Sequence, residues 1–163
     1  MFTTGALDSL GGKGHSKKVV LNLMKNHLGC GRSLYINNFY TGIDLAEELL
    51  RNNTYCTGTL NVKRKGIPEE VKKASLKKGD TVSKYQKAIL VGKWKDKREV
   101  LYLSTEFENN LTEIENRRGK QLKKPLPILE YNKYMCGVDH KDQMLSYYPC
   151  ERKTIRWYKE VVI

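Results

Sequence analysis

Two acidic residues, Asp139 and Asp142, are the side chains whose type and spacing best suit chemistry. They lie three residues apart at the start of a predicted helix that Gly137 introduces, so both carboxylates share one helix face. Carboxylate oxygens arranged in this way can hold a divalent metal ion. The competing interpretation is an acidic first turn that complements the helix dipole. Because acidic first turns are common, spacing alone favours this second interpretation.

A series of short blocks around and upstream of these acids follows a recognisable order. The blocks are residues 34–42, 45–50, 58–60, 64–68, 94–97, 103–105, 137–144, 147–149 and 151–153. Together they resemble piggyBac-type transposases: the first two blocks are similar to the family's central motif, and the last three to its final catalytic block. Because the order is kept from about Gly11 to the C-terminus, the resemblance is more specific than a single short motif.

The resemblance implies a ribonuclease-H-like catalytic domain in which three aspartates hold two Mg²⁺ ions and cut DNA. Asp139 matches the third of these positions, with Asp142 as a supporting acid. The second position falls at Asn37, which begins the run Asn37-Asn38-Phe39-Tyr40. The first would precede residues 9–11, beyond the start of this sequence, and Asp8 is a poor substitute for it. Asp139 is then the surviving metal ligand and Asn37 the substituted position.

The loss of carboxylates predicts a loss of catalysis. Two-metal phosphoryl transfer needs anionic oxygens that hold both ions and align the attack. A carboxylate supplies two acceptor oxygens and a negative charge, whereas an amide supplies one neutral oxygen and a donor nitrogen. We therefore expect that the chain by itself binds little or no Mg²⁺, the cofactor of the ancestral enzyme, and does not cut DNA.

Two other functional hypotheses stay open on the sequence. In the first, the chain belongs to an active metal-dependent transposase or nuclease when an upstream part supplies the first aspartate. In the second, the reading frame is decaying and has no function. An upstream segment that encodes the missing acid would favour the first, and the absence of detectable protein would favour the second.

Charge points to a nucleic-acid partner. The 163 residues carry a formal net charge of +12. Within residues 62–98, thirteen Lys or Arg face four Asp or Glu, a local net charge of +9. Such a surface suits phosphate contacts, although a solvated lysine-rich face fits the charge equally well. Family resemblance favours DNA, and the predicted phosphate contacts are Lys63, Arg64, Lys65, Arg152, Lys153 and Arg156.

Location and assembly follow from the same features. No apolar run approaches the roughly 18 residues of a membrane span, so no membrane partner is expected. The resemblance implies a nuclear protein, with a homodimer as a candidate assembly. The cysteines Cys30, Cys56, Cys136 and Cys150 form no C-x-x-C pair, which disfavours structural zinc and predicts reduced thiols.

The first third of the chain has the pattern of a β-α-β unit. Ser16 is the predicted N-cap of a helix over residues 17–27, which Gly29 ends. Residues 33–37 form a predicted strand, a helix from Thr41 or Gly42 runs to Leu50, and residues 54–62 form a second strand. This order favours a right-handed crossover and parallel pairing of the two strands.

Residues 63–129 have a different, β-rich pattern. Residues 85–94 and 99–104 are predicted strands joined by a hairpin turn at 95–98, and residues 123–127 an extended linker. A last helix is predicted over residues 152–163. We therefore predict an α/β fold: a partial ribonuclease-H-like domain, with a mixed sheet and flanking helices, interrupted by a β-rich insertion. The predicted division is 1–62 and 130–163 for the transposase domain, and 63–129 for the basic insertion.

Overall fold

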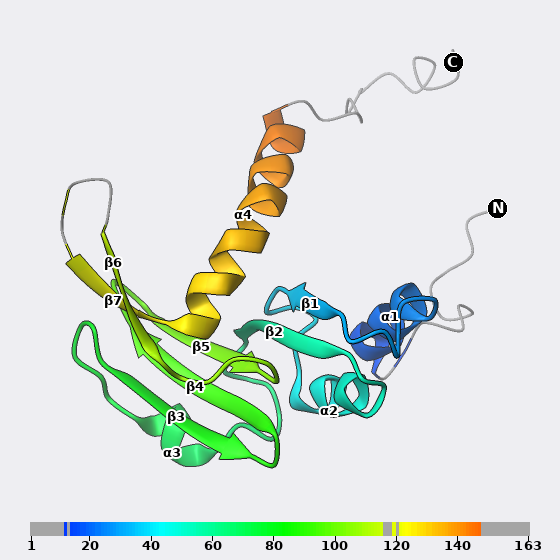
Figure 1. The fold of residues 1–163 in the computed structure, drawn as a ribbon, viewed down its shortest axis with the longest axis horizontal. Helices are drawn as coiled ribbons and strands as arrows, with labels where there is room; N and C mark the ends of the chain where they lie inside the picture. The colour runs from blue at the N-terminus through cyan, green and yellow to red at the C-terminus, as the bar shows by residue number, and fades with distance from the viewer. Residues whose placement is uncertain (1–11, 13, 116–118, 120, 148–163) are drawn as a thin grey trace.

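The computed structural model describes residues 12, 14–115, 119 and 121–147, and for residues 137–147 it describes the backbone alone (Figure 1). The described strands are β1 Ser33–Ile36, β2 Tyr55–Leu60, β3 Thr81–Gln86, β4 Ile89–Lys95, β5 Glu99–Ser104, β6 Leu111–Glu115 and β7 Gln121–Pro125. The described helices are α1 His15–Met24, α2 Ile43–Arg51, α3 Glu69–Lys73 and α4 Leu126–Tyr147.

The main sheet is mixed. Its five strands have the order β1-β2-β5-β4-β3, and β6 and β7 form a separate two-stranded sheet. β1 pairs in parallel with β2, with Ser33 opposite Tyr55, and the remaining pairs of the main sheet are antiparallel. The predicted parallel pairing of the first two strands is confirmed, and so is the α/β class with a mixed sheet and flanking helices.

Both faces of the main sheet are covered. Successive side chains of β4 and β5 point to opposite faces of the sheet, and side chains on both faces are buried. Ile89 and Val91 of β4 pack in one cluster with α2 and α3, whereas Leu90 and Trp94 pack in a second cluster with Ile128 of α4. Accordingly, Figure 1 shows α4 leaving the sheet on the side away from α3. The strands that look continuously apolar in the sequence are therefore central strands buried on two sides.

Helix α2 forms as its sequence predicts. Its buried residues Ile43, Leu45, Ala46 and Leu49 lie on one face, with Asp44 in the first turn and Arg51 in the last. The chain then turns through Asn53, which has φ 45°, into β2. Burial of each leucine contributes about 1.5–3 kcal/mol, so this helix is held mainly by its packing on the sheet.

The prediction for the start of α1 was wrong by two residues. The helix begins at His15, and its N-cap is Gly14 in the left-handed conformation, with φ 80°. Ser16 lies inside the first turn and cannot act as the cap. Glycine reaches this conformation without steric cost, which explains why the helix starts there.

The prediction for the region around Gly137 was also wrong. α4 begins at Leu126 and runs without a break through Gly137, so Asp139 and Asp142 lie in its interior and not in a first turn. Pro127 stands in the first turn, where its missing N–H costs nothing. The predicted linker 123–127 is instead the end of β7 followed directly by the helix. The interpretation as an acidic first turn is therefore wrong, whereas the two acids still lie three residues apart in one helix, so their role as metal ligands stays a prediction.

The β-rich segment extends the main sheet. β5 pairs with β2 through Thr57 opposite Ser104, and the predicted hairpin of β4 and β5 is present. The predicted single strand over residues 85–94 is two strands, because the chain reverses at Lys87, which adopts φ 58°. Thus residues 81–104 continue the sheet begun by β1 and β2, since the buried run of β5 needs a paired neighbour on each side. The three-part domain division itself stays a prediction.

Gly92 of β4 lies opposite Tyr102 of β5 in register. A Cβ at Gly92 would overlap the Tyr102 ring. That ring is buried, and its hydroxyl lies 3.0 Å from Thr81 Oγ1 and also contacts Asn109. Burial raises the Tyr102 pKa to about 12, so the phenol stays protonated at neutral pH. The ring therefore cannot turn aside without breaking this hydrogen-bond network.

We predict that Gly92→Ala lowers the free energy of unfolding by about 1–3 kcal/mol, the usual cost of overpacking. Urea denaturation followed by tryptophan fluorescence measures the change. In a Tyr102→Leu background the additional loss from Gly92→Ala should be smaller, because the overlapping ring atoms are gone. Equal losses in both backgrounds would contradict the steric explanation.

Candidate nucleic-acid interface at the end of strand β1

The loop that follows β1 is fixed by Thr41. This side chain is fully buried, and its hydroxyl donates to the Asn37 carbonyl at 2.7 Å and lies 3.2 Å from the Ile36 carbonyl. The Thr41 backbone N–H also donates to the Asn37 carbonyl, at 3.0 Å. These contacts close the chain into one tight turn between the end of β1 and the start of α2, so Asn37 has a defined position.

Gly58 of β2 makes this turn possible. A Cβ at Gly58 would lie 2.6 Å from Thr41 Oγ1 and would overlap the Ile36 carbonyl oxygen. Gly58 pairs with Ile36 in the parallel ladder, so the close approach comes directly from strand register. Only glycine fits beside the hydroxyl here.

Asn37 has one side-chain oxygen, and one of its two acceptor lone pairs is already used. Oδ1 accepts the Phe39 backbone N–H at 3.2 Å. The other polar atom of the amide is a nitrogen, which donates hydrogen bonds and cannot bind a cation. The exposed Asn37 side chain therefore presents a donor to solvent.

The predicted phosphate contacts Lys63, Arg64 and Lys65 lie close to this turn. The Arg64 guanidinium donates to the Phe39 carbonyl, which joins residues 25 positions apart. The Lys63 backbone N–H donates to Asn61 Oδ1 at 3.0 Å, and the Lys63 and Lys65 side chains are exposed. Among the described residues, no carboxylate forms an ion pair with these three cations. We call Lys63–Arg64–Lys65 the basic strip.

Two open clefts flank the basic strip. The first, of about 460 Å³, is lined by Gly14, His15, Ser16, Asn38, Phe39, Asn61, Lys63 and Arg64. The second, of about 570 Å³, is lined by Gly42, Ile43, Asp44, Glu47, Lys63, Arg64, Lys65, Gly66 and Gln86. Among the described residues, the lining of the first cleft has no acidic side chain, whereas that of the second has two. The first is therefore the better surface for an anion, and we call it the β1 cleft.

A buried lysine anchors the chain downstream of the strip. Lys93 Nζ donates to the carbonyls of Ala74 at 2.6 Å and Lys72 at 3.2 Å, and it pairs with Glu99 Oε2 at 2.9 Å. These bonds satisfy carbonyls at the end of α3. Hydrogen bonding to Lys93 lowers the Glu99 pKa. With Ile67 and Val71 buried, the segment that bears the strip is tied to the sheet.

Helix α4 is tied to the strand that precedes the turn. Tyr35 of β1 and Tyr134 of α4 stack with ring centroids 4.4 Å apart and planes 23° apart. Burial, and then the nearby Glu106 carboxylate, raise the Tyr35 pKa to about 12. The stack lies two residues before Asn37 and five before Asp139, so the structure joins the two elements that carry these positions.

The described metal-ligating side chains do not form a divalent metal site. Within the described residues, no three His, Cys, Asp or Glu side chains are grouped as metal ligands would be. The one oxygen of Asn37 is engaged with Phe39. The side chains of Asp139 and Asp142, and the predicted contacts Arg152, Lys153 and Arg156, lie outside the described residues, as does Cys150. Cys30, Cys56 and Cys136 are free thiols.

The matches to known proteins agree with this arrangement of elements. A family model described as Transposase IS4 matches residues 6–163. The chain belongs to this transposase family. The predicted piggyBac-type resemblance is confirmed by a solved structure, the cryo-EM structure of a piggyBac transposase synaptic complex with hairpin DNA. It is 27% identical to this chain, with a TM-score of 0.72.

This likeness covers 98% of the chain and 33% of that transposase, so the chain spans about a third of its length. Transposases of this family generally use a divalent metal ion in catalysis. The family resemblance predicts metal-binding positions at Asn37 and Asp139. The structure describes the side chain of Asn37 alone, and Asn37 is not a carboxylate. Among the described residues, no helix is long and apolar enough to cross a membrane.

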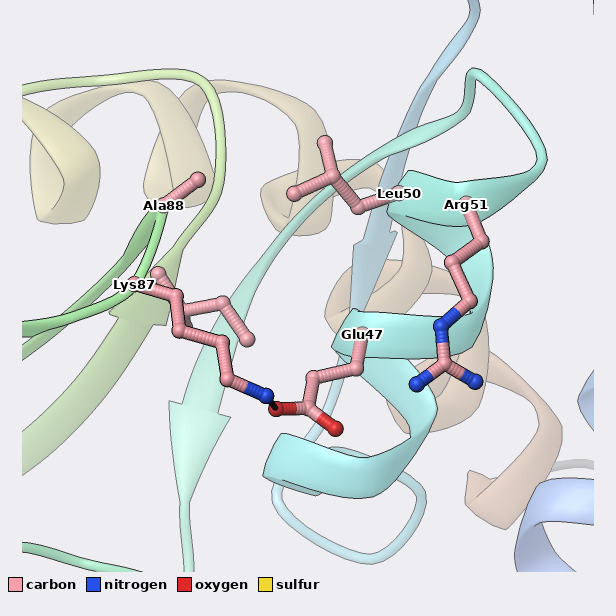
Figure 2. A pocket seen from close by; sticks show the side chains of 6 residues that line it. Glu47, Leu50, Arg51, Lys87 and Ala88 are labelled. Atoms are coloured by element: carbon pink, nitrogen blue, oxygen red, sulfur yellow. Dashed lines mark hydrogen bonds and ion pairs between the residues drawn. The ribbon is translucent and has the colours of Figure 1, made fainter.

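A third cleft, between α2 and the β3–β4 turn, is bridged by an ion pair. Figure 2 shows Lys87 and Glu47 pointing toward one another, with Leu50, Arg51 and Ala88 around them. Lys87 Nζ lies 2.9 Å from Glu47 Oε1, and this hydrogen bond lowers the Glu47 pKa. The pair links α2 to the β3–β4 turn, in which Lys87 has positive φ.

We predict that Lys87→Met raises the Glu47 pKa toward its ordinary value, as measured by NMR titration. A depressed folded-state pKa gives stability that is present above the unfolded pKa and lost as pH falls. The stability difference between wild type and Lys87→Met should therefore shrink on acidification through the carboxyl range. Lys97→Met, in the β4–β5 turn, is the matched control and should leave Glu47 unchanged. An unchanged Glu47 titration in Lys87→Met would contradict the assignment.

Proposed function

We propose that this transposase-family chain binds DNA through phosphate contacts and does not cut it by itself. The observation that carries the proposal is the β1 cleft, where Lys63 and Arg64 lie beside the turn of Asn37 and the described lining residues include no acidic side chain. The solved transposase is a complex with DNA, which supports the choice of partner. The nucleus is the compartment in which such binding has a target, and a homodimer stays a prediction.

Charge supplies the affinity in this proposal. Lysine and arginine side chains that neutralise phosphates release condensed counterions, and this term dominates sequence-independent binding. Lys63 is an exposed point charge, whereas Arg64 keeps guanidinium donors beyond those used on the Phe39 carbonyl. The site therefore offers two cations and the donor nitrogen of Asn37, all suited to phosphate oxygens. Phosphate contacts carry no sequence information, so little sequence preference is expected from them.

The same residues argue against strand cleavage. Mg²⁺ usually relies on carboxylates and near-octahedral geometry. At the position of the second family aspartate, the amide of Asn37 brings no charge, and its oxygen is held by Phe39. By resemblance the residues of this sequence bring Asp139, with Asp142 as a supporting acid, to a site that needs three aspartates to hold a pair of metal ions.

We predict catalytic silence. Supercoiled or transposon-end DNA incubated with the purified chain and Mg²⁺ or Mn²⁺ should show no nicking above buffer, because Asn37 supplies no anionic ligand. Asn37→Asp is the matched variant, since it adds a carboxylate at equal size. It should bind Mn²⁺ more tightly than wild type in calorimetry. Nicking by wild type that disappears in Asp139→Ala would refute the proposal and favour an active enzyme.

We predict a steep salt dependence of DNA binding. The logarithm of the binding constant should fall linearly with the logarithm of salt concentration, by about 0.9 per phosphate neutralised on B-DNA. Removing Lys63 and Lys65 together, as methionines, should reduce the slope by about 2 × 0.9. Lys84→Met is the control, because Lys84 already pairs with Glu70. Affinity that does not change between low and physiological salt would rule out an electrostatic surface.

A further inference from the structure

Phe39 is an apolar side chain that the fold leaves outside its core. It is 60% exposed although it lies between the buried Ile36 and Thr41. Its neighbour Tyr40 packs against the core, and the two rings meet edge to face, with centroids 4.9 Å apart and planes 81° apart. The contact gives the Phe39 ring a fixed neighbour while most of its surface faces solvent. Large exposed aromatic side chains are a common feature of binding surfaces.

The backbone of Phe39 is held from both sides. Its N–H donates to Asn37 Oδ1 at 3.2 Å, and its carbonyl accepts from the Arg64 guanidinium. The turn that carries it is closed by buried Thr41. An exposed ring on a fixed backbone loses little conformational freedom when it binds a flat ligand.

The surroundings of the ring restrict the class of ligand. The β1 cleft places Phe39 together with the cations Lys63 and Arg64 and with the amides Asn38 and Asn61. A planar apolar surface flanked by cations is the combination that proteins use for single-stranded nucleic acid, where bases stack on aromatic rings and cations follow the backbone. Amide side chains can hydrogen-bond to base edges. The absence of acidic side chains from the lining of this described cleft fits a ligand that carries phosphates.

Stacking also selects between forms of DNA. In a duplex each base is already stacked on its neighbours, and a protein reaches only the base edges in the grooves. A ring such as Phe39 can stack only on a base that is unpaired or displaced. The basic strip alone would not distinguish the two forms, because both carry phosphates.

We propose that Phe39 is a stacking platform for an unpaired DNA base, with Lys63 and Arg64 holding the adjoining phosphates. The proposal rests on the DNA-binding function proposed above and deepens it: the β1 cleft prefers DNA with an unpaired base to a continuous duplex.

The experiment compares Phe39→Leu with wild type on a single-stranded oligonucleotide and on a duplex of the same sequence. Phe39→Leu should weaken single-strand binding by on the order of tenfold or more, the range for loss of one stacked base, and should change duplex binding by less than about twofold. Phe39→Trp should retain or strengthen single-strand binding. Tyr85→Leu is the matched control, because Tyr85 is 57% exposed on β3 and outside the β1 cleft. It should change neither affinity.

A second readout tests stacking directly. An oligonucleotide that contains 2-aminopurine should lose fluorescence on binding wild type and Phe39→Trp, and should lose less with Phe39→Leu. Thermal denaturation of each variant checks that folding is intact, as expected for an exposed side chain.

The outcomes separate the two proposals. Single-strand binding that is unaffected by Phe39→Leu, or equal losses on both DNA forms, would overturn the stacking platform and leave phosphate binding standing. Duplex binding without measurable single-strand binding would overturn it as well. If wild type binds neither form at low salt, both proposals fail.

Discussion

The hydrogen bonds of the buried Thr41 hydroxyl are the contacts on which the candidate site depends. They tie the last carbonyls of β1 to the start of α2, and they exist because Gly58 leaves room beside them in the parallel ladder. Three consecutive features follow from this closure. The Asn37 amide turns back onto the Phe39 N–H, Phe39 is directed to solvent, and its carbonyl becomes available to Arg64. A hydroxyl with no measurable exposure thus determines the geometry of an exposed cleft.

Residues 33–60 fold almost as their sequence indicates, because each element carries a local signal. The strand β1 is a short run that includes Leu34, Tyr35 and Ile36, α2 has one apolar face, and β2 again favours strand. Local signals fail where tertiary packing decides. The reversal at Lys87 uses positive φ without glycine or asparagine. Helix α4 begins at Leu126, packs on the sheet through Ile128 and continues through Gly137. In the first place the sequence pattern predicted one strand where two form, and in the second it predicted a helix start where a helix continues.

The candidate site was predictable in its parts and not in its arrangement. Asn37 and the basic strip are identifiable from residue type and family resemblance. That Lys63 and Arg64 share a cleft with Asn38 and Phe39, the residues that follow Asn37, depends on the tertiary fold. The contact between Arg64 and Phe39 joins residues 25 apart, and no local pattern encodes it. The sequence carries no local signal for the exposure of Phe39, which lies between Asn38 and Tyr40. Its exposure becomes visible only once Tyr40 and Thr41 occupy the interior on either side of the turn.

Under the proposed function, an amide in place of the family carboxylate at position 37 changes two properties of the turn beside this cleft in opposite directions. A carboxylate on the turn would repel phosphate unless a cation lay between them, which is the arrangement that metal-dependent phosphoryl transfer requires. An amide removes both the repulsion and the means of binding the cation. Phosphate can then approach Lys63 and Arg64 directly, and the Asn37 nitrogen adds a donor where an acceptor would have stood. Under the proposed function, metal-dependent cleavage and metal-independent binding are alternative uses of one backbone turn, and the side chain at position 37 selects between them.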